Sequence, residues 1–272
     1  MNSVLSRRAR LLLVTMSFAV SACSSADATS STNTTTVATI APATTTTSTT
    51  STSTTTSTTT STTTLPPFPS YSIAPIGVGG DSAAHLSKVD TVDKVVFLTI
   101  DDGIVKDQRV MDFLVEHRWP ATLFLVSGEF KKDPLYFAQI LTVGGNISSH
   151  TSTHPELSGL DFDTQRKQIC GMRGTIEKAL GSAGHLFRPP YGSWDETTLR
   201  AAASCGINAV VTWNSELWEG NVDLAHRPAL QPGDVFLTHF RNDLYDNLVA
   251  LEARLTAEGF TVGNLEDYLP NQ

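Results

Sequence analysis

Short apolar runs alternate with amphipathic segments along the chain from residue 68 onward. Four apolar runs have the length and composition of buried strands, at residues 95–100, 121–126, 209–213 and 235–237. Four segments repeat their apolar residues with helical spacing, at residues 110–117, 164–180, 197–205 and 244–258. Because strand and helix alternate repeatedly, the pattern predicts a mainly parallel sheet covered by helices, either an open layer or a barrel.

The N-terminal region has a different character. Residues 1–22 combine a basic start, a short apolar run and small residues before Cys23, which predicts a secretory signal. The four residues ending at Cys23 (VSAC) resemble a bacterial lipobox, so we expect Cys23 to carry a lipid; an ordinary cleavage site is the alternative. Residues 23–67 are rich in Ser and Thr and predict a disordered linker. The protein is thus expected to be exported and lipid-anchored to the outer face of the bacterial cytoplasmic membrane or cell envelope, or secreted.

Charge and cysteine content narrow the function classes. The formal net charge of −8 falls to −11 when the signal, with three arginines and no acid, is removed. This excess of acid disfavours binding to nucleic acid.

Three cysteines are too few for a scaffold built from disulfides. Outside the cytoplasm Cys170 and Cys205 could pair, or both could be buried thiols, and the sequence does not decide between these alternatives.

Residues capable of chemistry recur where strands are expected to end. Asp101 and Asp102 close the first long strand, and His239 closes the last one. His150 and Arg188 follow two shorter apolar segments. In α/β barrels the active site gathers at the carboxyl ends of the strands, so this placement predicts a site there.

Two histidines and a carboxylate are the candidate metal ligands. His150 and His154 have i, i+4 spacing, which in a helical turn would place both imidazoles on one face. Taken alone, such a pair is more often structural, and an Asp-Asp-Gly sequence is more often a loop or a helix cap. Together with Asp102, however, the pair forms a set of two histidines and one carboxylate that leaves coordination positions open for water and substrate.

Five motifs occur in the order and approximate spacing of a known family. They are TIDDG (99–103), HTSTH (150–154), RPPYG (188–192), the tryptophan-bounded segment 213–218, and LTH (237–239). Over residues 93–266 the chain resembles the polysaccharide deacetylases, carbohydrate esterase family 4. The resemblance implies an α/β fold, a distorted (β/α) barrel with fewer than eight regular strands, in a single catalytic domain spanning residues 68–272.

The resemblance also assigns roles to individual residues. Asp101 matches the family's general base, and Asp102, His150 and His154 match its metal ligands. His239 matches the general acid that protonates the departing amine or alcohol. One divalent ion is implied, zinc being favoured, with cobalt, nickel or manganese as alternatives.

Three further residues match positions that bind the substrate or the transition state. Arg188 resembles the arginine that orients the catalytic aspartate, and a bidentate guanidinium there would keep Asp101 ionised; a surface arginine is the alternative. The backbone N–H of Tyr191 would stabilise the tetrahedral oxyanion. Leu237 would line the pocket for the acetyl methyl group.

The fourth motif departs from the family pattern. Relatives usually have an Asp-rich segment ending in Asp-Trp, whose carboxylate tunes the acidic histidine. Here Glu216 is the candidate substitute as partner of His239, and Trp218 is the expected sugar-facing aromatic.

The sequence as a whole predicts a metal-dependent hydrolase that removes acetyl groups from an envelope or extracellular polysaccharide. N-deacetylation of peptidoglycan or another amino-sugar polymer is favoured by the predicted tether. The alternatives are an O-acetyl-xylan esterase, a non-catalytic glycan-binding lipoprotein, and a metal hydrolase of small amides or cyclic imides. We expect a monomer that contacts the membrane only through its lipid.

Overall fold

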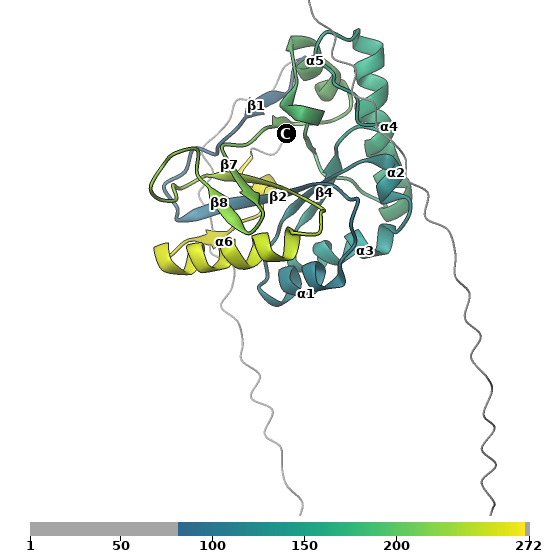
Figure 1. Ribbon diagram of the computed structural model, residues 1–272. Coiled ribbons are helices and arrows are strands. Elements are labelled where there is room, and N and C mark those ends of the chain that lie inside the picture. Colours follow the sequence, from purple (N-terminus) through teal and green to yellow (C-terminus); the bar gives the residue numbers. More distant parts are fainter. Residues whose placement is uncertain (1–80, 270–272) are drawn as a thin grey trace, which may run out of the picture. The chain divides into compact units, whose positions relative to one another are not determined.

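Ten strands form one curled sheet in the part of the chain that the computed structural model describes, residues 81–269 (Figure 1). They are β1 (Ala84–Leu86), β2 (Val95–Asp102), β3 (Thr122–Leu125), β4 (Asn146–Ser149), β5 (Leu186–Phe187), β6 (Ala209–Val211), β7 (Ser215–Trp218), β8 (Asn221–Asp223), β9 (Val235–His239) and β10 (Thr261–Val262). Several predicted features lie outside the described residues: the signal, the lipid site at Cys23, the linker, and residue 68, where the catalytic domain is expected to begin.

The strand order is β1-β6-β5-β4-β3-β2-β9-β7-β8, with β10 beside the start of β2. Among these named strands all pairs are parallel except the β7–β8 hairpin. The order begins at β1 and ends at β8 and is not closed into a ring. Five of the strands have four residues or more. The expected distorted barrel with fewer than eight regular strands is therefore confirmed.

Helices cover the outside of the sheet (Figure 1). The α-helices are α1 (Gln108–Glu116), α2 (Ser127–Phe130), α3 (Pro134–Ala138), α4 (Phe162–Leu180), α5 (Glu196–Ser204) and α6 (Leu244–Glu258). Three short 3₁₀ segments complete the described part, η1 (Gln139–Val143), η2 (Pro190–Gly192) and η3 (Leu265–Tyr268). None of the described helices combines the length and the apolar character needed to cross a membrane.

The ends of α4 show how local sequence sets these elements. The Asp161 side chain accepts a hydrogen bond from the Thr164 N–H, which satisfies one of the free donors of the first turn. Gly181 ends the helix in the left-handed conformation, with φ of 83°. Asp107, Asp133 and Asp195 cap α1, α3 and α5 in the same manner.

Strand β2 passes through the centre of the molecule and contributes to packing on both of its faces. Val96, Leu98 and Ile100 pack into the cluster that includes residues of α1 and α6. The intervening Val95 and Phe97 belong to a second cluster on the barrel side. Because side chains alternate along a strand, Thr99 and Asp101 face the same side as Phe97. The alternation thus directs Asp101 into the barrel.

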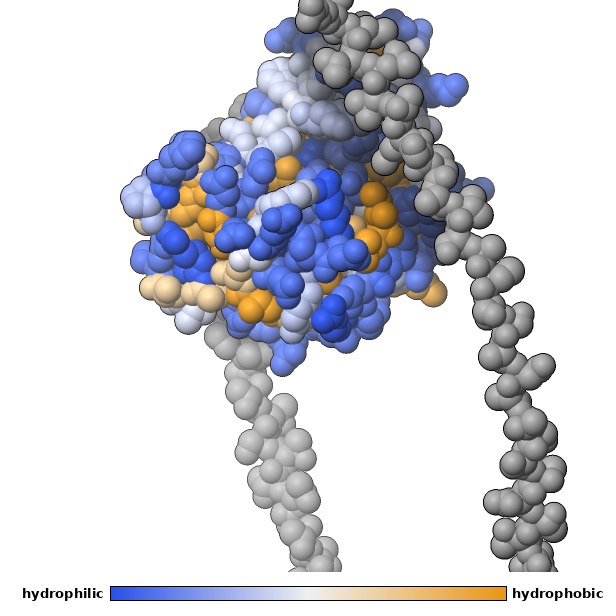
Figure 2. All heavy atoms as spheres, viewed as in Figure 1, coloured by the Kyte–Doolittle hydropathy of each residue, from blue (hydrophilic) through white to orange (hydrophobic). Residues whose placement is uncertain are grey.

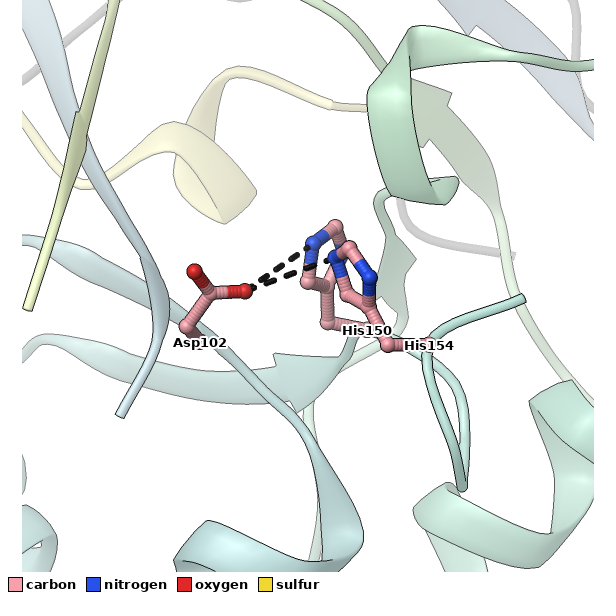
Figure 3. A group of neighbouring side chains, drawn as sticks. All are labelled: Asp102, His150 and His154. Carbon is pink, nitrogen blue, oxygen red and sulfur yellow. Dashed lines mark ion pairs between the residues drawn. The ribbon is translucent and has the colours of Figure 1, made fainter. Parts of the chain in front are cut away.

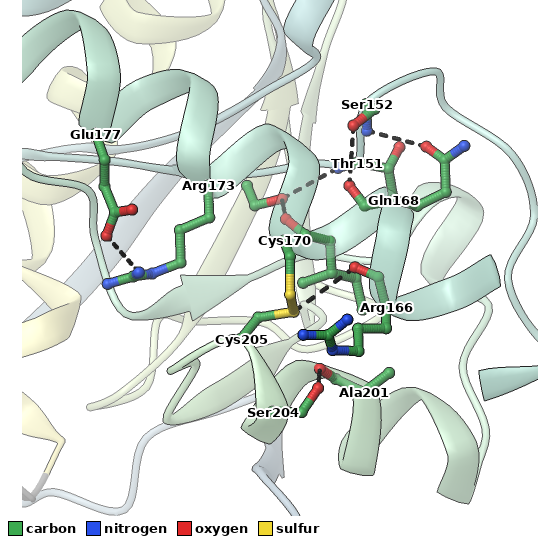
Figure 4. The surroundings of a disulfide bond; sticks show 12 residues. Thr151, Ser152, Arg166, Gln168, Cys170, Arg173, Glu177, Ala201, Ser204 and Cys205 are labelled. Carbon is green, nitrogen blue, oxygen red and sulfur yellow. Dashed lines mark hydrogen bonds and ion pairs between the residues drawn. A yellow bond between two sulfur atoms is a disulfide. The ribbon is translucent and has the colours of Figure 1, made fainter. Parts of the chain in front are cut away.

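A disulfide joins Cys170 in α4 to Cys205, the residue after α5 (Figure 4). The Cα atoms are 5.1 Å apart, within the range that a disulfide requires. The sequence left open whether Cys170 and Cys205 form a disulfide or are two buried thiols, and the structure shows the disulfide. The bond links two helices that cover neighbouring parts of the sheet.

The surface is mainly polar on the face drawn in Figure 2, where hydrophobic areas are separated by hydrophilic residues. Exposed large apolar side chains include Val92, Leu135 and Tyr191, which come from different parts of the chain. Scattered apolar side chains are ordinary on a protein surface.

Candidate active site

Asp101 and Asp102 end β2 and direct their carboxylates into the same space. Neighbouring residues of a regular strand point to opposite sides. Asp102, however, has φ of 75°, and Gly103 follows with φ of 90°. This left-handed turn breaks the alternation, so that each aspartate has a carboxylate oxygen 3.7 Å from His150 Nε2. A non-glycine residue in this conformation costs about 1–3 kcal/mol, which the surrounding packing must offset.

The two histidines lie in a loop, so the expected helical turn at residues 150–154 is wrong. Thr151 and His154 have φ of 73° and 61°, values that a right-handed helix excludes. Thr151 Oγ1 accepts a hydrogen bond from the His154 N–H at 2.9 Å and closes the loop. The loop nevertheless brings His150 Nε2 and His154 Nε2 to 3.7 and 3.5 Å from Asp102 Oδ1 (Figure 3).

Gln168 of α4 holds this loop and was not predicted. Its Oε1 accepts hydrogen bonds from the backbone N–H groups of Ser152 at 3.1 Å and Thr153 at 3.0 Å. Its Nε2 donates to Thr153 Oγ1 at 2.9 Å. Figure 4 shows Gln168 beside Ser152, on the helix that carries Cys170. The sequence does not predict this contact, because a polar residue on an amphipathic helix is usually exposed to solvent and only the fold shows that the histidine loop lies beside it.

The hydrogen bond of His150 indicates what its other nitrogen can bind. His150 Nδ1 lies 2.7 Å from the carbonyl oxygen of Arg188, and since a carbonyl only accepts, Nδ1 carries the proton. Burial lowers the pKa of His150, against the opposing effect of Asp101, and favours the neutral ring. Nε2 then presents a lone pair toward two carboxylates. Such an arrangement is unfavourable unless a cation lies between them.

The spacing of the three groups fits a small cation. Ligand atoms of Asp102, His150 and His154 all lie within 4.8 Å of one another. Four ligands at about 2.0–2.1 Å from a tetrahedral zinc ion are about 3.3 Å apart, close to the 3.5 and 3.7 Å observed between Nε2 and Oδ1. The structure thus brings together the three residues predicted as ligands.

Arg188 is fully buried, which rules out a surface arginine. Its Nη1 donates to Asp101 Oδ1 at 2.9 Å and to Thr99 Oγ1 at 2.6 Å. The contact with Asp101 is a single hydrogen bond and not the bidentate pair expected, because Nε and Nη2 donate to the carbonyl oxygens of Val211 and Thr212. Burial lowers the pKa of Arg188, and Asp101 opposes this effect. The side chain of Arg188 therefore fixes Asp101 while its carbonyl fixes His150.

These residues line one pocket of about 430 Å³. Its lining comprises Asp101, Asp102, His150, His154, Pro189, Tyr191, Trp213, Glu216, Leu217, Trp218, Leu237, His239 and Arg241. A cavity of this size can hold a small ligand or part of a longer one. Every predicted site residue that the structure describes lines the pocket except Arg188, which lies behind Asp101.

His239 lies directly across the sheet from Asp101. The two residues are register partners on the parallel strands β9 and β2. Residues paired in this way point to the same side of a sheet, so both side chains face the pocket. Leu237, two residues earlier, is also directed there and is buried.

Glu216 is not bonded to His239, contrary to the expectation. Its carboxylate accepts a hydrogen bond from Trp213 Nε1 at 2.5 Å. Within the described residues no hydrogen bond or ion pair joins Glu216 to His239. Glu216 is the register partner of Leu237, not of His239, and its carboxylate is hydrogen-bonded to the indole of Trp213.

Two aromatic residues form the outer part of the pocket. Tyr191 is 71% exposed, and its ring meets that of His154 edge to face at 4.8 Å between centroids. Its φ of 61° places the RPPYG turn in the left-handed region. Trp218 is 47% exposed and has the Arg241 guanidinium over its ring. Arg241 was not predicted, although its position two residues after His239 could have indicated it.

The comparisons with known proteins agree with this geometry. The family model described as polysaccharide deacetylase matches residues 88–210. An uncharacterised protein of Streptomyces coelicolor is 40% identical over 191 residues, which cover 66% of this chain and 75% of that protein. A chitooligosaccharide deacetylase of Sinorhizobium fredii is 32% identical over 153 residues, covering 53% of this chain and 71% of the relative.

A solved structure shows the same fold. The crystal structure of a peptidoglycan N-acetylglucosamine deacetylase superposes with a TM-score of 0.60 at 24% sequence identity, covering 70% of this chain and 94% of the other. The expected fold and enzyme class are thus confirmed, and the chain belongs to the polysaccharide deacetylase family.

Proposed function

We propose that this protein is a metal-dependent hydrolase that removes N-acetyl groups from an amino-sugar polymer, with envelope peptidoglycan as the favoured substrate. The observation that carries the proposal is the arrangement of Asp102, His150 and His154 beside Asp101 in one pocket. The related chitooligosaccharide deacetylase supports an N-acetylated sugar as the substrate class. The predicted tether supports a substrate in the envelope.

Asp102, His150 and His154 would hold the metal, zinc being favoured over cobalt, nickel and manganese. Two imidazoles and one carboxylate leave coordination positions open, as a catalytic site requires. A bound divalent ion would polarise the acetyl carbonyl and lower the pKa of a water molecule. The neutral His150, with its proton fixed on Nδ1 by the Arg188 carbonyl, is already in the tautomer that such binding needs.

Asp101 is the general base of the proposed mechanism. Arg188 occupies its Oδ1, which leaves Oδ2 free to accept a proton from the attacking water. Oδ2 is the oxygen that lies 3.7 Å from His150 Nε2 and therefore faces the ligand cluster. The hydrogen bond from Arg188 holds the carboxylate in the position that this role requires.

His239, facing the same space from β9, would donate a proton to the departing amine. The backbone N–H of Tyr191 would stabilise the oxyanion, and Leu237 would contact the acetyl methyl group. Trp218 offers an exposed ring on which a sugar can stack. These roles together describe hydrolysis of an acetamide by a positioned base, an oxyanion donor and an acid.

The setting of the enzyme belongs to the same proposal. Cys23 would anchor the exported protein to the membrane by its lipid, and residues 23–67 would let the domain reach the glycan. The protein would act as a monomer, and nucleic acid is not among its partners.

Acetate release from defined glycans tests the proposal. The whole chain would be incubated with peptidoglycan, chitin oligomers and acetyl-xylan, with and without a chelator. We expect chelator-sensitive release from the N-acetylated glycans, and the Asp101→Asn variant should retain metal while losing most of the rate. Release from acetyl-xylan alone, or activity on small amides alone, would contradict the substrate class. Activity that persists after the metal has been removed would contradict the mechanism.

A further inference from the structure

Among the described residues that line the pocket, Arg241 is the one lysine or arginine. The other charged side chains of the lining are Asp101, Asp102 and Glu216, and the chain as a whole carries a net charge of −8. A single fixed cation at the edge of an otherwise acidic pocket changes the local potential there. It favours an anionic group at that edge, away from the position beside Asp102, His150 and His154 where the proposed metal would be held.

The side-chain donors of Arg241 have no acceptor among the described residues. Within the described part of the chain its guanidinium has no hydrogen bond or ion pair; it lies over the ring of Trp218, with Cζ 4.7 Å from the ring centroid, and its charge helps to lower the pKa of Asp243. The nearby Asp243 is engaged elsewhere, because its Oδ2 accepts from the Glu219 N–H at 2.9 Å and from Asn247 Nδ2 at 3.2 Å.

Several other arginines of the described residues are paired with acids. Arg109 bonds Asp107, Arg227 bonds Asp234, and Arg188 bonds Asp101. Arg241 differs because stacking on Trp218 fixes the plane of its guanidinium while leaving the N–H edges open. A guanidinium held in this way is prepared to receive a carboxylate through two parallel hydrogen bonds.

We infer that Arg241 and Trp218 form a subsite for a sugar that carries a carboxylate, next to the acetylated sugar in the polymer. The exposed indole of Trp218 would contact the sugar ring, and Arg241 would bind the free carboxylate of a uronate or of a lactyl ether that carries no peptide. The inference rests on the proposed function and specifies its substrate class as an acidic N-acetylated glycan. Arg241 is then a specificity determinant and takes no part in the proton transfers.

A matched pair of substrates tests the subsite. Acetate release would be measured on an N-acetylated oligosaccharide with a free carboxylate on the neighbouring sugar, and on its methyl ester. We expect the wild-type protein to prefer the acid by about tenfold in kcat/KM, or about 1.4 kcal/mol, mainly through KM, since the ester keeps the sugar but loses the charge that Arg241 would bind. In Arg241→Gln the ratio of acid to ester should fall to about one. In Arg241→Lys the ratio should recover only in part, because lysine keeps the positive charge but lacks the planar pair of N–H donors of a guanidinium.

Arg109→Gln is the control. Arg109 is also stacked on an aromatic ring, 4.8 Å over Tyr245, but it is more exposed than Arg241 and lies outside the pocket lining. This variant should keep the preference of the wild type for the acid. An equal loss of preference in Arg109→Gln would overturn the subsite in favour of a general charge effect. A wild-type ratio near one, or an unchanged ratio in Arg241→Gln, would overturn it directly.

A binding measurement separates this inference from the proposed function. Calorimetric titration with the deacetylated acid and its ester requires no turnover. Acid-selective binding that is lost in Arg241→Gln would support the subsite even if no acetate were released, an outcome in which only the proposed function fails. Acetate release without acid-selective binding would overturn the subsite and leave the proposed function in place.

Discussion

Removing the disulfide should lower the stability of the fold without removing the active site. The bond between Cys170 and Cys205 closes a loop with a sequence separation of 35 residues. For a loop of that length the chain-entropy model gives about 13 cal/mol/K, or roughly 3.8 kcal/mol at 25 °C. A folded region of this size loses about 2–4 °C in Tm for each kcal/mol. We therefore expect the double variant Cys170→Ala, Cys205→Ala to melt about 8–15 °C below the wild type.

The site should survive this change at moderate temperature. The loop with His150 and His154 is held by Gln168, whose hydrogen bonds do not involve the cysteines. Acetate release by the double variant at 25 °C should accordingly stay within about threefold of the wild type.

Calorimetric melting with and without a reductant is the assay. The reductant should lower the Tm of the wild type to that of the double variant and should leave the double variant unchanged. A difference below about 3 °C between the two proteins would refute the reasoning, because the cross-link would then not restrict the unfolded chain.

Three further predictions concern the contacts around the site. Gln168→Leu should weaken metal affinity by about tenfold in a calorimetric titration while changing Tm little, because the loop keeps its ligands but loses its support; unchanged affinity would contradict this role. Arg188→Leu should lower the free energy of unfolding by about 3–5 kcal/mol in denaturant titration, since it leaves the Asp101 charge buried without its partner; a loss below 1 kcal/mol would contradict the buried pair. Glu216→Gln should keep kcat within about threefold, because an amide oxygen can still accept from Trp213; a loss of a hundredfold would show that Glu216 acts on His239 after all.

The fold could be predicted to a large extent from the sequence, because its long elements have clear periodicity. The expected helix at residues 244–258 coincides with α6, and the expected strand at residues 95–100 lies within β2. Strands β5 and β10 have two residues each and gave no periodic signal. Pairing with a neighbouring strand defines such elements, and pairing is not visible in a local pattern.

The sequence predicted which residues form the candidate site better than it predicted their geometry. Motif order brought Asp102, His150 and His154 together correctly, but the helical turn assumed for the histidines was wrong because Thr151 and His154 adopt left-handed φ values. Such values depend on tertiary support, here from Gln168, and not on local propensity.

Glu216 failed as the partner of His239 for a different reason. Motif spacing identified Glu216 as the residue that replaces the usual aspartate, but it did not show which way the side chain points. The carboxylate of Glu216 accepts a hydrogen bond from the indole of Trp213.

The central claim is that one cation is bound by His150 Nε2, His154 Nε2 and a carboxylate oxygen of Asp102. The most direct test is anomalous diffraction at the zinc edge from crystals of the protein grown with zinc. We predict a single strong peak in the pocket, about 2.0–2.2 Å from each of these three atoms. A pocket without a peak, or a peak bound by other residues while these side chains stay apart, would contradict the account.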